Sequence, residues 1–177
     1  MNKQFYGSAA KKIAVTAMFM ALEIVLSLRI FTIPTPIGNF YFNDVLIVIA
    51  SILLDPVSSF IACGVGAFLG DVLFYPAAMF VSLVTRGLQA VAISLISHYA
   101  FKNKPLLSSI IAAAVGAVIA VLGYTLGKIF FYSTMEYAMM KLPLQIAMSV
   151  TGAVLGIVVC YPLRIKNTYE KIFCKKA

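Results

Sequence analysis

Ionisable side chains stand inside otherwise apolar stretches of this sequence. Glu23, Arg86 and Lys128 lie within apolar runs, and Asp71 lies near the end of another. In a membrane, a charged side chain near the bilayer centre costs ~2.5–3.5 kcal/mol on insertion scales, so these residues should face a cavity or a partner charge. Two cations with one or two acids would suit a carbonyl-rich, phosphorylated or carboxylated molecule. A structural charge network, with Glu23 paired to Arg86 or another cation, is the alternative interpretation.

Helical spacing gathers more polar residues into stripes. The stripes join residues three or four apart, Arg86 with Gln89, Tyr124 with Lys128, and Gln145 with Ser149. Aromatic rings alternating with a few polar groups in a membrane-buried, concave space suit a small ligand with a flat ring and hydrogen-bonding edges. We therefore predict a binding pocket. Its predicted residues are Asn39, Tyr41, Asn43, Asp71, Tyr75, Arg86, Gln89, Tyr124, Lys128, Gln145 and Ser149.

Motifs for catalysis, metal binding and ATP hydrolysis are absent or incomplete. The segment 123–128 looks slightly like a phosphate loop, but it lacks one spacer residue and the Ser or Thr after the lysine. The sequence contains neither H-E-x-x-H nor G-x-S-x-G. Cys63, Cys160 and Cys174 lie far apart, with no histidine cluster near them. We expect no catalytic residues, no metal site and no cofactor of the chain's own.

Composition places these residues in a membrane protein. Of 177 residues, 62% are hydrophobic and 11% charged, and the mean hydropathy is +1.00. A soluble domain has roughly 45–50% apolar and about 25% charged residues, so a water-soluble enzyme is excluded. The net charge of +8 is carried by short connections and chain ends, as membrane topology requires, so nucleic acid is not an expected partner.

The elements that must position the pocket are helices. We predict an all-α, polytopic membrane protein in which residues 1–177 form a single integral membrane domain, a bundle of six transmembrane helices. Their predicted ranges are 12–31, 43–54, 56–75, 78–100, 106–132 and 142–163. The second is short, a Pro-Gly loop at 32–43 precedes it, and Asp55-Pro56 should cap and open the third.

The distribution of basic residues orients the bundle. An even number of helices puts both termini on one side, and that side collects ten of the fourteen basic residues: Lys3, Lys11, Lys12, Lys102, Lys104, Arg164, Lys166, Lys171, Lys175 and Lys176. By the positive-inside rule it is cytoplasmic, which predicts a multi-pass protein of the cell membrane. The outer face then carries the 32–43 loop, the Tyr75-Pro76 corner and the 133–141 loop, where we expect the chemistry.

Small residues recur four apart along several helices. The glycine pairs 66/70, 123/127 and 152/156 predict close packing between helices, which holds membrane spans together. A second series, Ala10, Ala14, Ala17 and Ala21, lies toward the cytoplasmic end of the first helix. Internal packing and an exposed docking face for a partner are both open for this series.

The layout resembles the substrate-binding S components of energy-coupling factor transporters, which capture vitamins for an ATPase-driven module. Ala17-Met-Phe-Met-Ala21 looks like the A-x-x-x-A docking motif of that family. The stretch Gly66-Ala-Phe-Leu-Gly-Asp71, with Tyr75-Pro76 and Arg86-Gly87-Leu88, looks like the riboflavin-type group. This sequence departs from that group in having Arg86 where lysine is more usual, and Gln89 in place of a small or acidic residue.

The resemblance implies a transporter subunit rather than an enzyme. The alanines of the first helix would face a shared transmembrane coupling subunit, and two cytoplasmic ATPases would use ATP to drive delivery. The 32–43 loop would cover an outer pocket for riboflavin, hydroxymethylpyrimidine, pyridoxine or a related precursor. The alternatives are an autonomous ion- or proton-coupled carrier, with Glu23 and Asp71 as coupling acids, and a non-transporting membrane scaffold.

Overall fold

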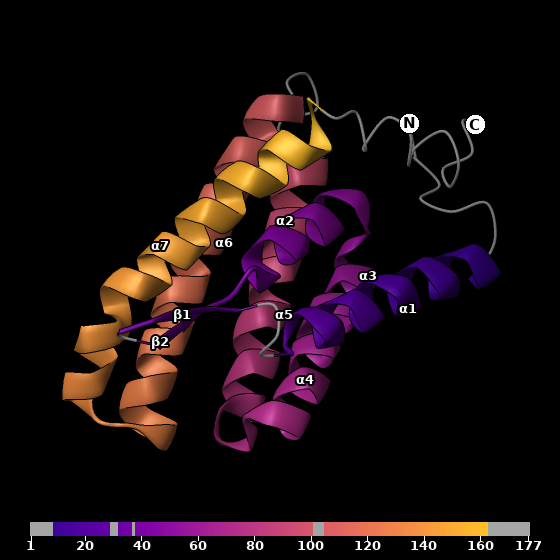
Figure 1. The fold of residues 1–177 in the computed structure, drawn as a ribbon. Coiled ribbons are helices and arrows are strands. Elements are labelled where there is room, and N and C mark those ends of the chain that lie inside the picture. The colour runs from indigo at the N-terminus through magenta and orange to yellow at the C-terminus, as the bar shows by residue number, and fades with distance from the viewer. Residues whose placement is uncertain (1–8, 29–31, 37, 101–104, 163–177) are drawn as a thin grey trace.

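The computed structural model describes residues 9–28, 32–36, 38–100 and 105–162. Within these ranges the chain forms six helical rods and one small β-hairpin (Figure 1). The first two rods are α1 (Ala9–Leu26) and α2 (Asn43–Leu53). The third rod consists of α3 (Pro56–Ser59), η2 (Phe60–Val65) and α4 (Gly66–Phe74), and the fourth of η3 (Pro76–Ala78), α5 (Met79–Leu95) and η4 (Ile96–Ala100). The fifth consists of α6 (Pro105–Gly127) and η5 (Lys128–Tyr132), and the sixth is α7 (Met135–Cys160).

Four of these rods are long and apolar enough to cross a membrane, among the residues described. They are Pro56–Phe74, Pro76–Tyr99, Pro105–Phe131 and Met135–Cys160. The α1 helix has 18 residues but carries Lys11, Lys12 and Glu23, and α2 has only 11 residues. The fold is therefore an all-α membrane protein, as the sequence predicts.

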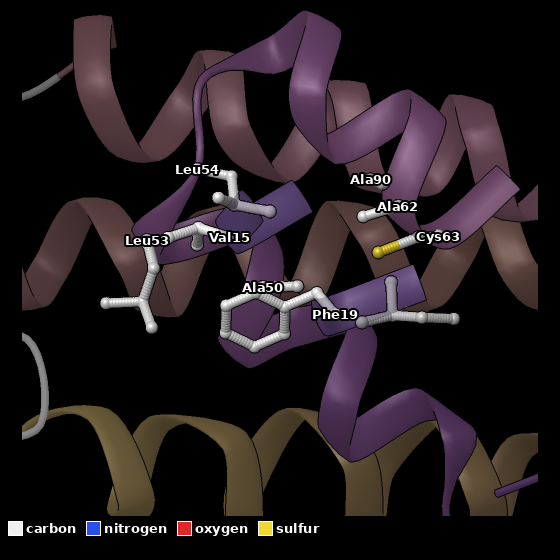
Figure 2. Packing of buried hydrophobic residues seen from close by; sticks show 9 residues of the cluster. Val15, Phe19, Ala50, Leu53, Leu54, Ala62, Cys63 and Ala90 are labelled. Carbon is white, nitrogen blue, oxygen red and sulfur yellow. The ribbon is translucent and has the colours of Figure 1, made fainter. Parts of the chain in front are cut away.

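The short helix α2 lies at the centre of the bundle. Figure 1 shows α6 and α7 on one side and α1, α3 and α4 on the other, with α2 and α5 between them. Two apolar clusters meet on α2. One joins Val15 and Phe19 of α1 to Ala50 and Leu53 of α2 and to Cys63 of η2 (Figure 2). The other joins the opposite face of α2 to α5, α6 and α7.

Glycines let the helices approach closely, as the sequence predicts. A methyl group on Gly152 of α7 would lie 2.4 Å from the Cβ of Asp44 on α2. On α4, Gly66 lies against Glu23 of α1, and Gly70 lies against Ser27 just beyond the end of α1. The pair on α6 faces α5 in the same way. The packing interpretation of the three glycine pairs is confirmed, and the contacts at Gly66, Gly70 and Gly152 are made with polar side chains.

The connection between α2 and α3 has the predicted cap. Asp55 is the N-cap of α3, its carboxylate accepts a 3.3 Å bond from the Ser58 amide, and Pro56 follows it. Lys12 of α1 donates to the same carboxylate at 3.1 Å. Burial alone would raise the pKa of Asp55, but the hydrogen bonds from Ser58 and Lys12 outweigh burial and hold it below its usual value.

Two helix boundaries differ most from the sequence prediction. The first helix ends at Leu26 rather than near residue 31, and the Ser27 hydroxyl donates back to the Glu23 carbonyl there. The last helix begins at Met135 rather than 142, because Thr134 caps it by accepting from the Tyr137 amide at 3.4 Å. Pro143 lies inside this helix. The predicted 133–141 loop is therefore mostly helix.

The predicted 32–43 loop contains a two-stranded hairpin. Strands β1 (Ile33–Thr35) and β2 (Gly38–Phe40) pair antiparallel, with Thr35 opposite Gly38. The Thr35 hydroxyl donates to the Gly38 carbonyl across the turn. Gly38 has φ +151°, a conformation that favours glycine. Beyond the hairpin, the Tyr41 amide lies 3.3 Å from the Met148 sulfur of α7, which ties this segment to the bundle.

Candidate ligand-binding cavity

A cavity of about 270 Å³ opens at the hairpin end of the bundle. Small-molecule sites usually occupy roughly 300–1,000 Å³, so this volume favours a compact ligand. Helices α1, α2, α4, α5, α6 and α7, the start of η5 and strand β2 all contribute to its wall. Nine of the eleven predicted pocket residues line it: Asn39, Tyr41, Asn43, Asp71, Tyr75, Arg86, Tyr124, Lys128 and Gln145.

The floor of the cavity is a buried ion pair. Arg86 of α5 donates to Asp44, the acidic residue in the first turn of α2. The guanidinium also donates to the Gln89 amide oxygen at 3.1 Å and to the Tyr124 hydroxyl at 3.1 Å. Ser149 donates to the other oxygen of Asp44 at 3.4 Å. Gln89 and Ser149 therefore support the floor and do not line the cavity, contrary to the sequence prediction.

Glu23 pairs with an amide instead of the predicted cation. Asn43, the first residue of α2, donates from its side-chain nitrogen to Glu23 Oε1 and to the Ser27 hydroxyl, both at 3.1 Å. Glu23 has no exposed surface, yet its carboxyl group borders the cavity. Oε2 of Glu23 and Oδ1 of Asn43 are buried without a hydrogen-bond partner within the described structure. The alternative interpretation, in which Glu23 pairs with Arg86 or another cation, is not what the described residues form, because Arg86 pairs with Asp44.

The opposite wall carries two lysines and an amide. Lys128 begins the π-helical segment η5, and Lys141 belongs to α7. Lys141 Nζ lies 4.7 Å from the centre of the Tyr137 ring and reaches the hairpin turn, where a methyl group on Gly38 would be 2.8 Å away. The side-chain nitrogen of Gln145 is buried and lacks an acceptor among the residues described.

Several lining residues are missing from the sequence prediction. Lys141 and Tyr137 fall in the segment predicted as a loop. Ser27 and Ser82 lie four residues from Glu23 and Arg86, so the same helical spacing could have identified them. Asp44 does not line the cavity but pairs with Arg86, and it is the more instructive omission, since it is an acid directly before the apolar run of α2. This position in the sequence could have identified Asp44 as an ion-pair partner, because an acid at the start of a buried helix requires a cation nearby.

The comparison with known proteins decides the family. The family model for the S component of the ECF-type riboflavin transporter matches residues 8–170, nearly the whole chain. The chain belongs to this family. This S component is therefore a substrate-specific component of a transporter and not an enzyme. An uncharacterized protein in the gap 3' region of Pyrococcus woesei is 27% identical over 124 residues, 70% of this chain and 81% of that protein.

The docking residues predicted for this S component all lie on one exposed surface. Ala10, Ala14, Ala17 and Ala21 of α1 are exposed, whereas Val15, Phe19 and Glu23 of the same helix are buried. The alanines are thus not used for packing inside the described structure, which removes the internal-packing interpretation.

Proposed function

We propose that this S component captures a vitamin or cofactor precursor of the riboflavin, hydroxymethylpyrimidine or pyridoxine class in the cavity. The observation that carries the proposal is the cavity itself, which ends on the buried pair of Arg86 and Asp44. Below that pair, α2 and α5 are packed with fully buried apolar residues such as Ile47 and Ile93. A pocket closed in this way holds its ligand but offers it no path through the protein.

The lining favours a ring compound. Tyr41, Tyr75, Tyr124 and Tyr137 offer aromatic surface, while amides and charged groups offer a few fixed hydrogen-bonding positions. Such a mixture suits a flat ligand with a polar edge, because the rings bury its faces and the polar groups set its orientation. The family supports the same class of substrate.

We further propose that the cavity faces outward and that both chain ends are cytoplasmic, with all six helices in the cell membrane. The cavity lies at the end of the bundle that holds the hairpin and the start of α7, and the start of α6 lies at the other end (Figure 1). The basic residues of 101–104 and those after Cys160 adjoin that other end in the sequence. The positive-inside rule then places it in the cytoplasm.

Delivery across the membrane would need partners. We propose that the exposed alanine surface of α1 binds a transmembrane coupling subunit, which works with two cytoplasmic ATPases that use ATP. Small side chains at Ala10, Ala14, Ala17 and Ala21 leave a shallow surface on which a second helix can pack closely. The family supports such a module in general terms.

The test is to identify what the purified protein carries. The S component is purified in detergent, weighed by native mass spectrometry and denatured, and the released small molecules are identified by mass and ultraviolet spectrum. A stoichiometric ring-containing vitamin or precursor is the expected result. An empty protein that gains no thermal stability from a panel of such compounds would overturn the proposal. Uptake by vesicles containing this chain alone would favour the autonomous carrier.

A further inference from the structure

Three buried polar atoms of residues that line the cavity have no hydrogen-bond partner among the described residues, and they include both acceptors and a donor. Glu23 Oε2 and Asn43 Oδ1, on α1 and α2, are acceptors, and Gln145 Nε2, on α7, is a donor. The three side chains are 0%, 7% and 4% exposed. Buried polar atoms are normally paired, and leaving one unpaired is costly. A ligand that donates toward α1 and α2 and accepts from α7 would satisfy all three.

The charged side chains of the cavity are separated in the same way, with the lysines on the side of α6 and α7 and the acids on the side of α1 and α4. Lys128 is 8% exposed and lines the cavity, and neither a hydrogen bond nor an ion pair engages it among the described residues. The charged groups that act most strongly on it are Lys141 and Arg86, both positive. The charge of Arg86 is already matched by Asp44. The remaining acids of the cavity, Glu23 and Asp71, lie on α1 and α4.

A neutral ligand would leave this lysine wall uncompensated. An ammonium group held away from water is stable only with an anion or several acceptors close to it. Lys128 has neither among the described residues, and Lys141 is held over the Tyr137 ring rather than against a carboxylate. Lysine acts as a point charge on a flexible stem, so two lysines can close on an anionic group that enters between them.

We propose that the substrate is the anionic form of a ring compound, such as a phosphate monoester, rather than the neutral vitamin. Lys128, Lys141 and the Gln145 amide hold the anionic group, and Glu23 and Asn43 accept hydrogen bonds from the ring edge. This inference rests on the proposed function and narrows its substrate. It also assigns Lys141, on a helix that reaches the hairpin turn, to the substrate site.

The experiment compares matched pairs of ligands. The purified protein is freed of bound ligand and titrated with riboflavin and riboflavin 5′-phosphate, and with pyridoxine and pyridoxine 5′-phosphate. For the ring that binds, we expect the phosphorylated form to bind at least about tenfold more tightly, the effect of one hydrogen bond between charged groups. This preference should shrink as salt concentration rises.

Lysine variants locate the anion. In K128M/K141M the preference for the phosphorylated form should fall to near unity, and Lys141→Met alone should lower it if the double variant does not fold. Lys12→Met is the matched control, because Lys12 pairs with Asp55 at the other end of α1 and should leave the preference unchanged. Melting temperatures establish that each variant is folded.

Two different results would contradict the anionic substrate and the proposed function, respectively. If the neutral form binds as tightly as the phosphorylated form, or if the lysine variants keep the preference, the anionic substrate is wrong and the proposed function stands. If no member of either pair binds, and no vitamin copurifies with the protein, the proposed function itself fails.

Discussion

The ion pair at the cavity floor should be energetically coupled, and three variants measure this. Asp44→Asn removes the carboxylate charge, Arg86→Met removes the guanidinium, and the double variant removes both. Breaking a buried ion pair by deleting one partner typically costs ~3–5 kcal/mol, because the other charge stays buried and unmatched. Deleting both partners costs much less than the sum of the single changes.

The remaining contacts predict which single variant is worse. Without Arg86, the Asp44 carboxylate keeps only Ser149, at 3.4 Å. Without the Asp44 charge, Arg86 keeps the Gln89 oxygen and the Tyr124 hydroxyl, both at 3.1 Å. We therefore expect Arg86→Met near the upper end of ~3–5 kcal/mol and Asp44→Asn near the lower end. The first turn of α2 favours a negative charge by only ~0.3–1 kcal/mol, too little to reverse this order.

The assay is unfolding by sodium dodecyl sulfate in mixed micelles, followed by far-ultraviolet circular dichroism. Ser149→Ala is the control, since it removes one hydrogen bond and should cost only ~0.5–1.5 kcal/mol. We expect the double variant to be at least ~2 kcal/mol more stable than the sum of the two single effects predicts. Single variants that each cost under ~1 kcal/mol, or strictly additive effects, would refute the buried pair.

Three further predictions concern packing, pH and docking. Gly152→Ala should cost ~1–3 kcal/mol in the same assay, because its methyl group would meet the Asp44 backbone at 2.8 Å and neither helix can yield; an unchanged midpoint would contradict the contact. Asp55→Asn should lower the melting temperature at neutral pH. The pKa of Asp55 is lowered in the folded protein, so its stabilisation is lost as pH falls through that lowered pKa. The difference in melting temperature should therefore shrink at acidic pH, and a difference that does not change with pH would contradict stabilisation by the Asp55 charge. Ala17→Trp should abolish copurification with the coupling subunit while ligand affinity stays unchanged, and a surviving complex would move the docking surface elsewhere.

Local sequence signals were sufficient for most helices. Asp55-Pro56 marked the boundary between α2 and α3, and each glycine pair marked a helix contact. The predicted start of α7, at residue 142, was wrong. The helix already exists two turns earlier, capped by Thr134, and tolerates Pro143 in its interior.

The sequence predicted which residues line the site more successfully than it predicted which residues pair with one another. Helical spacing identified which polar side chains face inward, because that depends only on the period of the helix. It did not identify Asp44 as the partner of Arg86, since 42 residues separate them and only tertiary packing sets their contact. Lys141 was missed for the related reason that its segment was predicted as a loop.

The shortness of α2 has an electrical consequence. Eleven residues of α-helix span about 16 Å, roughly half of a 30 Å hydrocarbon core, and the cavity lies at the end of α2 that holds Asn43. With the outward-facing cavity proposed above, a ligand bound there would have crossed part of the membrane potential before any partner acts. For an anion entering from outside an inside-negative cell, half of a 100 mV potential opposes binding by about 1 kcal/mol per charge. The lysine wall would have to offset that cost, so affinity in energised membranes should be lower than in detergent.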